Sequence, residues 1–195
     1  MAIVQTSTKT YYSPDEYLEL ETKAEYKSEY HDGQIIPMAG GKVNHNRIAL
    51  NLSSALNFAS RGKPYSVFMS DLRLWIPNYR LYTYPDVMVV NKPLMFAENR
   101  QDTIINPLMI TEVLSDSTEK YDRGDKFRMY RTISSFQEYL LISQTAIQVE
   151  RFAKNDNNQW VLSEYSEKED KIIFDSFEFE ISLDELYENV DLDSV

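Results

Sequence analysis

The chain has 195 residues, a formal net charge of −11, no cysteine and only two histidines. Without cysteine there can be no disulfide or thiolate metal site, and two histidines make a zinc site built from imidazoles a poor fit. The negative charge argues against a protein that coats nucleic acid by neutralising phosphates, but it leaves room for an enzyme whose carboxylates carry divalent cations.

The first third is expected to hold a short helix, a hairpin and a longer helix. The sequence SPDE at residues 13–16 is a capping box with proline at the first helical position, which predicts a helix from Pro14 to Glu21. The pair Asp32-Gly33 predicts a tight turn between two short strands within residues 26–39. Apolar residues at helical spacing then predict a helix capped by Asn44 and ending near residues 61–62.

The middle third is expected to alternate between strands and a helix. Residues 65–76 and 81–90 are rich in β-branched and aromatic residues, which predicts two strands adjacent in one sheet. After a loop over residues 91–107 the chain predicts a buried strand at 108–114, a helix at 121–132 and a strand at 137–142. This order indicates a crossover unit.

The last third predicts an antiparallel meander and a closing helix. Residues 146–154, 159–165 and 171–175 alternate as strands do, with a turn at 155–158, and residues 181–190 predict the helix. No repeat and no linker rich in Pro, Gly or Ser divides the sequence. We therefore expect a single domain over residues 1–195, long enough to bury roughly 70% of the surface of its unfolded chain.

Two acids lie inside segments that are otherwise apolar. Glu112 falls within the predicted buried strand, where an unpaired carboxylate is costly. Asp86 follows Pro85 at the start of a second apolar strand. Two acids on neighbouring strands repel each other unless a cation lies between them. A hard ion such as Mg²⁺, which prefers carboxylate and carbonyl oxygens, meets this need.

A lysine lies on the apolar face of the helix that follows. On a helical wheel Lys126 falls in one stripe with Asp122, Met129 and Ile133, with Tyr130 beside it, so Lys126 should face the sheet. Two interpretations are open at this point. The lysine either forms an internal salt bridge with Asp122, four residues before it, or serves the two acids of the neighbouring strands.

The spacing of these residues resembles a known nuclease pattern. Asp86 after Pro85, with Glu112 26 positions later in an apolar strand, resembles the bipartite acidic motif of the PD-(D/E)XK nuclease superfamily. The wider sequence resembles the "putative restriction endonuclease" family of the Uma type, which is abundant in cyanobacteria. The segments that carry this resemblance are LELETKAEYKSEYHDGQIIPMAG, PDVMVV and PLMITEVLSDSTEKYDRGDKFRMYRTISSFQEYLLI, within a match from about Ser13 to Val190.

The resemblance implies an α/β fold of the restriction-endonuclease type. Its mixed central sheet should be flanked by helices, with an N-terminal hairpin and a C-terminal meander. It also implies a metal-dependent endonuclease that hydrolyses DNA, in which Asp86, Glu112 and the carbonyl of Val113 bind Mg²⁺ or Mn²⁺. The superfamily lysine, expected two residues after the acid, is replaced by Leu114, so Lys126 is the expected substitute that orients or helps to deprotonate the attacking water.

Three further residues are expected to support this site. Glu29 is predicted to add a carboxylate, with an exposed hairpin acid as the alternative. His45 is predicted to touch a phosphate or a metal-bound water, with a hydrogen bond at the helix terminus as the alternative. Asp122 is predicted to hold Lys126 in place.

Two other function classes remain open on the sequence alone. A glycosidase could use Asp86 and Glu112 as acid and base without a metal, which leaves Lys126 unexplained. A nuclease-like domain without activity could bind nucleic acid or a protein partner. Because nucleases of this class often pair to cut two strands, a homodimer is expected. The N-terminus lacks a secretory signal and no apolar run approaches a membrane span, so we expect a cytoplasmic protein that does not bind membranes.

Overall fold

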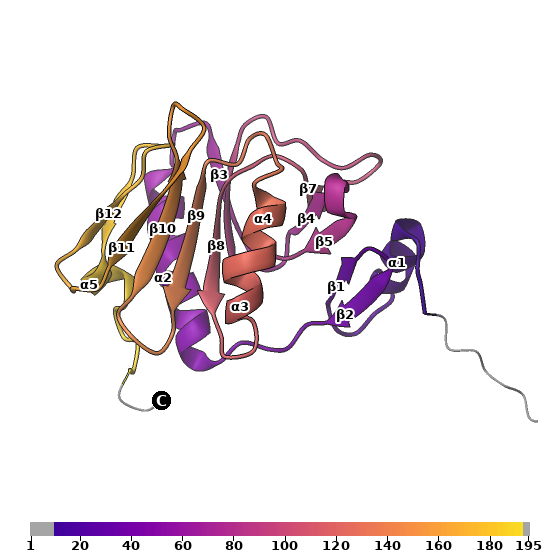
Figure 1. The fold of residues 1–195 in the computed structure, drawn as a ribbon, viewed down its shortest axis with the longest axis horizontal. Coiled ribbons are helices and arrows are strands. Elements are labelled where there is room, and N and C mark those ends of the chain that lie inside the picture. Colours follow the sequence, from indigo (N-terminus) through magenta and orange to yellow (C-terminus); the bar gives the residue numbers. More distant parts are fainter. Residues whose placement is uncertain (1–9, 193–195) are drawn as a thin grey trace, which may run out of the picture.

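The structure, a computed structural model that describes residues 10–192, is built on three β-sheets with helices around them (Figure 1). The largest sheet has six strands in the order β11 (Trp160–Tyr165), β10 (Val149–Lys154), β9 (Glu138–Ser143), β8 (Pro107–Leu114), β6 (Val87–Asn91) and β3 (Tyr65–Met69). The second sheet has the order β2 (Gln34–Pro37), β1 (Ser28–His31), β5 (Leu81–Thr83), β4 (Arg73–Ile76) and β7 (Thr103–Ile104). The third consists of β12 (Lys171–Ile173) and β13 (Glu180–Ser182).

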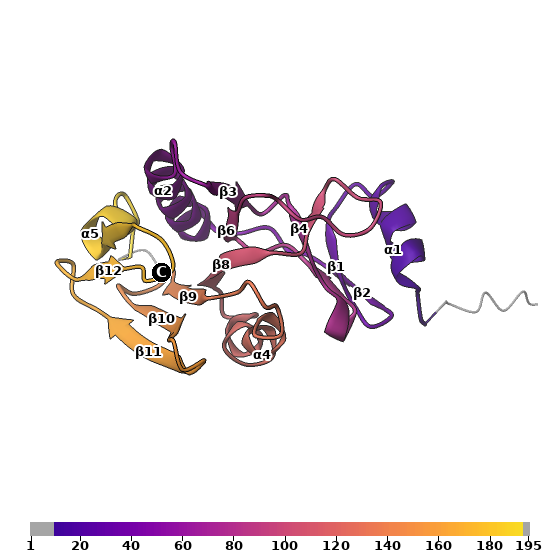
Figure 2. The same cartoon turned by 90° about the horizontal axis from the view of Figure 1, so that it is seen from above.

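Helices cover both faces of the six-stranded sheet. The helical segments are α1 (Pro14–Glu21), α2 (Val43–Ala59), η1 (Pro77–Tyr79), α3 (Glu119–Tyr121), η2 (Asp122–Lys126), α4 (Phe127–Tyr130) and α5 (Leu183–Leu186). Seen from above, α2 lies on one side of β8 and β9 and α4 on the other, while α1 lies beyond the five-stranded sheet (Figure 2). The predicted class, a mixed sheet flanked by helices, is confirmed. None of the helices within residues 10–192 has the length and apolar character needed to cross a membrane.

The predicted N-terminal helix and hairpin are both present. The Ser13 hydroxyl accepts the Glu16 N–H at 3.2 Å, and the Glu16 carboxylate accepts the Ser13 N–H at 2.8 Å, so α1 begins with a complete capping box. The turn between β1 and β2 has positive φ at Asp32 (40°) and at Gly33 (95°), as a type I′ turn requires. A Cβ at Gly33 would lie 2.1 Å from the Tyr11 ring, so any other residue would also require this exposed ring to move.

The prediction that residues 65–76 and 81–90 form two strands of one sheet is wrong. Each segment divides in two: β3 pairs antiparallel with β6 in the six-stranded sheet, and β4 pairs antiparallel with β5 in the five-stranded sheet. The two segments are neighbours, but both turn at the same point, where Ser70 N–H donates to the Asp86 carbonyl at 3.2 Å. Pro85 lacks the N–H that a continuous strand would need there.

The crossover unit is confirmed, although its helix differs from the prediction. The strands β8 and β9 pair in parallel on either side of the helical segment, as a crossover connection requires. The predicted helix at 121–132 is instead a short α-helical start, a π-helical turn over Asp122–Lys126 and the short α4, which ends at Tyr130. The strand predicted at 137–142 is β9, which runs from Glu138 to Ser143.

The C-terminal third departs from the prediction in two places. The strands β10 and β11 and the turn at 155–158 form the predicted antiparallel pair. The third predicted strand does not join them, because β12 pairs with β13 in a separate sheet. The predicted helix at 181–190 is reduced to α5, since its first two residues belong to β13 and the Ser182 hydroxyl caps the helix by accepting Glu185 N–H.

The longer helix also begins differently from the prediction. The N-cap of α2 is Lys42, and the helix starts at Val43. The Asn44 side chain, predicted to be the cap, instead donates to the carbonyls of Gln144 and Asp191. It therefore ties the start of α2 to the segments that follow β9 and α5.

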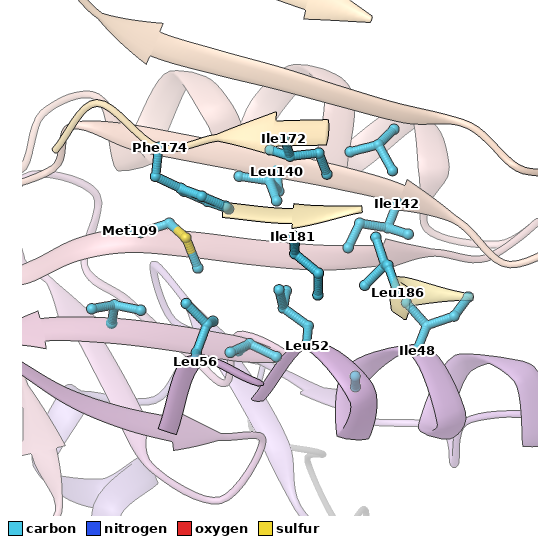
Figure 3. Close-up of a cluster of buried hydrophobic side chains, with 14 of the residues drawn as sticks. Ile48, Leu52, Leu56, Met109, Leu140, Ile142, Ile172, Phe174, Ile181 and Leu186 are labelled. Atoms are coloured by element: carbon cyan, nitrogen blue, oxygen red, sulfur yellow. The ribbon is translucent and has the colours of Figure 1, made fainter. Parts of the chain in front are cut away.

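The main core lies between the six-stranded sheet and α2 (Figure 3). Its members include Ile48, Leu52 and Leu56 of α2, Met109, Leu140 and Ile142 of the sheet, and Ile172, Ile181 and Leu186 of the C-terminal elements. A second cluster under α4 covers the opposite face of the sheet. All eight residues of β8 are therefore buried, which is typical of a central strand covered on both faces.

Candidate active site

The residues predicted for the site surround the end of β8, which lies beside α3 in Figure 1. Glu112 is 4% exposed and shares its face of β8 with Ile110 and Leu114, which pack into the cluster under α4. Its Oε1 atom lies 3.1 Å from Lys126 Nζ and accepts a hydrogen bond of 2.6 Å from the Tyr130 hydroxyl. The buried carboxylate is thus compensated by one cation and one neutral donor.

Lys126 is surrounded by three carboxylates. Its Nζ atom lies 3.1 Å from Glu112, 3.2 Å from Asp122 and 3.6 Å from Glu29. The salt bridge with Asp122 and the contact with the strand acid, which the sequence left as alternatives, are both present. The lysine is 7% exposed and faces the sheet, as the wheel predicted.

A π-helical turn places Asp122 and Lys126 on the same buried side. The two residues open and close this turn and are both buried, whereas Asp125 between them is exposed. The Tyr139 hydroxyl donates to the Asp122 carbonyl at 3.0 Å and so anchors the start of the turn to β9. Single π-helical turns within helices are frequent at functional sites.

Burial and neighbouring charges shift the pKa values of Glu112 and Lys126. Burial raises the pKa of Glu112 above its ordinary value, and the opposing charge of Lys126 reduces the effect only in part. Burial lowers the pKa of Lys126, but Glu112, Glu29 and Asp122 raise it by more, so its pKa lies well above the ordinary value. Lys126 is therefore a fixed positive charge at neutral pH.

The Asp86 side chain forms a hydrogen bond with the edge of β8. The pairing between β6 and β8 ends at Val87 and Thr111. If the same register continued, Pro85 would lie opposite Val113. The Asp86 side chain takes that place, because its Oδ2 atom accepts the Val113 N–H at 2.8 Å. The N–H and C=O of one strand residue point to the same edge, so the Val113 carbonyl lies on the side of Asp86.

His45 approaches Asp86 from the first turn of α2. Its Nε2 atom lies 3.1 Å from Asp86 Oδ2, and its buried Nδ1 atom has no hydrogen-bond partner among residues 10–192. Burial lowers the pKa of His45, but the hydrogen bond and the charge of Asp86 outweigh it, so the pKa is raised. The protonated imidazole is thus favoured in the folded state.

The raised pKa of His45 predicts a pH-dependent contribution to stability. The folded state binds the His45 proton more tightly than the unfolded chain, so the contribution is full below the unfolded pKa and is lost as pH rises through the folded pKa. We expect His45→Gln to lower the free energy of unfolding more at about pH 5.5 than at about pH 8.5. Urea unfolding with chelator at both pH values measures this difference, and an equal loss at both would contradict it.

Glu29 brings the five-stranded sheet to the site. It lies on β1, its side chain is 12% exposed, and its Oε1 atom accepts the Thr83 hydroxyl of β5 at 2.5 Å. The same oxygen is the one that faces Lys126. The predicted site residues therefore come from both large sheets and both faces of the six-stranded sheet.

The donor atoms suit a hard divalent cation that keeps part of its water shell. Among residues 10–192 no group of three or more His, Asp or Glu side chains is placed to hold a metal ion. Asp86 and Glu112 each use one oxygen for the hydrogen bonds above, and their other oxygens, Oδ1 and Oε2, have no hydrogen-bond partner within the described part of the chain. Two carboxylates with one carbonyl match the way Mg²⁺ is held when water and substrate phosphates complete its shell.

The sequence interpretation missed one residue that contacts the site. Tyr130 donates to Glu112, but a tyrosine in an apolar helix is expected to be packing, so its type gave no signal. The available signal was its spacing, because Tyr130 follows Lys126 by four residues and Asp122 by eight.

Comparison with known proteins shows similarity to a family model, to two relatives and to solved structures. A model of the Uma2 family, described as "Putative restriction endonuclease", matches residues 14–185. The Synechocystis sp. protein sll1609 is 46% identical over 149 residues, covering 76% of this chain and 84% of that protein. The protein slr1290 from the same organism is 38% identical over 177 residues, 90% of each chain. A crystal structure from Anabaena variabilis, titled "a putative nuclease belonging to DUF820", has the same fold, with a TM-score of 0.73 at 22% identity over 90% of this chain and 97% of that one.

Proposed function

The chain belongs to the Uma2 family, described as "Putative restriction endonuclease", and from this membership and the site geometry we propose that it is a metal-dependent endonuclease acting on DNA. The observation that carries the proposal is the contact of 3.1 Å between Lys126 and Glu112. The lysine missing from β8 is supplied by the adjacent helix and reaches the acid of the strand. This contact pairs a strand acid with a lysine, as a restriction-endonuclease-like site requires, and so supports the proposal.

Each residue has a distinct part in this proposal. Asp86, Glu112 and the Val113 carbonyl are the groups that would hold Mg²⁺ or Mn²⁺. Such an ion, when bound, would supply a lowered pKa for a water molecule and stabilisation of negative charge on the phosphate. Lys126, which stays protonated, orients the attacking water and the phosphate and does not serve as a base.

The remaining residues keep these groups in place. Asp122 and Glu29 hold the Lys126 ammonium group, and His45 holds Asp86 and can donate a proton toward a phosphate oxygen. The proposal also includes a homodimer, in which two sites act on the two strands of a duplex.

Cleavage of supercoiled plasmid tests the proposed function. Purified protein is expected to nick plasmid with Mg²⁺ or Mn²⁺ and to lose this activity with chelator. Glu112→Gln and Asp86→Asn are each expected to lower the rate at least about 100-fold, because each removes charge that holds an ion worth several kcal/mol to the transition state. Asp125→Asn, which changes an exposed acid of the same helical segment, is the matched control and should keep the wild-type rate.

Three results would contradict the proposal. Cleavage that survives both chelator and the two acid substitutions would come from another site or from a contaminant. Hydrolysis of a glycoside that persists in chelator would favour the acid and base pair of a glycosidase. Inactivity of the wild type on plasmid, linear duplex and single-stranded DNA with either metal would favour a module that binds without cleaving.

A further inference from the structure

Tyr130 is a buried residue whose hydroxyl donates to one of the site carboxylates. It is 0% exposed, and its hydroxyl donates to Glu112 Oε1 at 2.6 Å, the same oxygen that Lys126 approaches at 3.1 Å. Glu112 Oε2 has no hydrogen-bond partner among residues 10–192. The two donors thus converge on one side of the carboxylate and leave its other oxygen open.

We propose that Tyr130 is a positioning residue that fixes the rotation of the Glu112 carboxylate and so leaves Oε2 turned toward the site of the metal ion. This inference rests on the proposed function, since it assigns Glu112 to the ion. A carboxylate held at one oxygen by two donors has lost most of its freedom to rotate before the ion arrives. Hydrogen bonds of this kind to ligating side chains typically contribute about 10–100-fold to metal affinity.

The tyrosine ring is itself held by the core, so the position of its hydroxyl is well defined. It packs edge-on against Tyr139, with ring centroids 5.6 Å apart at 73°, and against Phe136 at 5.8 Å and 61°. These contacts belong to β9 and to the loop before it. A small movement of the ring would therefore require the second core cluster to rearrange.

Lys126 cannot give Glu112 a single orientation by itself. Its ammonium group is shared with Asp122 at 3.2 Å and with Glu29 at 3.6 Å, and a point charge attracts a carboxylate without setting its rotation. The Tyr130 hydroxyl has one hydrogen to donate, and Glu112 receives it. The tyrosine therefore adds to the Lys126 hydrogen bond a donor that Glu112 shares with no other carboxylate.

Binding of Mn²⁺ to the full-length protein, measured by calorimetry without DNA, tests this role. Tyr130→Phe keeps the ring and removes only the hydroxyl, and we expect it to weaken Mn²⁺ binding about 10–100-fold. Tyr187→Phe is the matched control, because Tyr187 is also buried and hydrogen-bonded but lies in the cluster on the opposite face of the sheet. It should bind Mn²⁺ as the wild type does.

A double-mutant cycle separates positioning from a general structural effect. If Tyr130 acts through Glu112, adding Tyr130→Phe to Glu112→Gln should change Mn²⁺ affinity less than about threefold. In cleavage assays, Tyr130→Phe should raise the Mn²⁺ concentration needed for half-maximal rate by the same factor as its loss of affinity. Saturating Mn²⁺ should restore most of the rate, which a loosened core would not allow.

The outcomes distinguish this inference from the proposed function. Wild-type affinity in Tyr130→Phe overturns the positioning role while the endonuclease proposal stands. A Tyr130→Phe protein that fails to fold assigns the hydroxyl to stability and also overturns the positioning role. A wild type that neither binds Mn²⁺ nor cleaves DNA overturns both.

Discussion

Lys126→Met is expected to abolish metal-dependent cleavage and to lower the free energy of unfolding by about 3–5 kcal/mol. The substitution keeps most of the apolar stem but leaves Glu112, Asp122 and Glu29 without the cation that lies within 3.6 Å of each. Uncompensated carboxylates in a buried site repel one another and must take up protons or water. Stability and activity should therefore fall together.

Chemical unfolding and plasmid cleavage measure the two effects separately. Lys120→Met is the matched control, because Lys120 is an exposed lysine in the same helical segment. We expect Lys120→Met to change the free energy of unfolding by no more than about 0.5 kcal/mol and to keep activity. If Lys126→Met were as stable and as active as this control, the lysine would be an ordinary salt-bridge residue with no part in the site.

A second large loss of stability is expected from a substitution away from the site. Glu138 on β9 is 1% exposed; its Oε2 accepts Arg151 Nε at 3.1 Å and its Oε1 accepts the N–H groups of Asp175 and Ser176, both at 2.7 Å. Glu138→Ala removes one of the two carboxylates that contact the buried Arg151 guanidinium, leaving Asp175 at 2.7 Å, and leaves two backbone donors unsatisfied. We expect a loss of about 3–5 kcal/mol in the free energy of unfolding.

An exposed ion pair provides the comparison for Glu138. The Glu180 carboxylate lies 2.7 Å from Lys171 Nζ, and both side chains are exposed. Glu180→Ala should therefore lower the free energy of unfolding by no more than about 1 kcal/mol. Urea unfolding of both variants measures the contrast. Equal losses would mean that water reaches the Glu138 pair and that its burial has no energetic consequence.

The sequence predicted well those elements whose signals lie within a short stretch of the chain. The capping box of α1, the Asp32-Gly33 turn and the crossover from β8 to β9 were all confirmed. The division of the paired strands at Pro85 between two sheets was missed, because residue preferences are the same for either sheet and only long-range packing decides between them.

Part of the candidate site could also be predicted from the sequence. Glu112 and Lys126 stood out because charged residues in apolar elements need compensation, and the structure brings the two together. The π-helical turn that carries Lys126 has no sequence signal of its own, and the hydrogen bond that ties its start to β9 joins residues 17 positions apart in the chain. Tyr130 was missed because an aromatic residue in a core needs no compensation.

The position of β8 between β6 and β9 has a consequence during synthesis on the ribosome. The chain delivers β6 before β8, but the parallel partner β9 follows only after the helical segment, so β8 remains an open edge until residue 143 has emerged. An apolar strand with one unpaired edge invites pairing with another chain. The helical segment with Lys126 emerges first and can cover one face of β8 in the interval. The single acid of this apolar strand, Glu112, can therefore be paired with Lys126 before β9 is available.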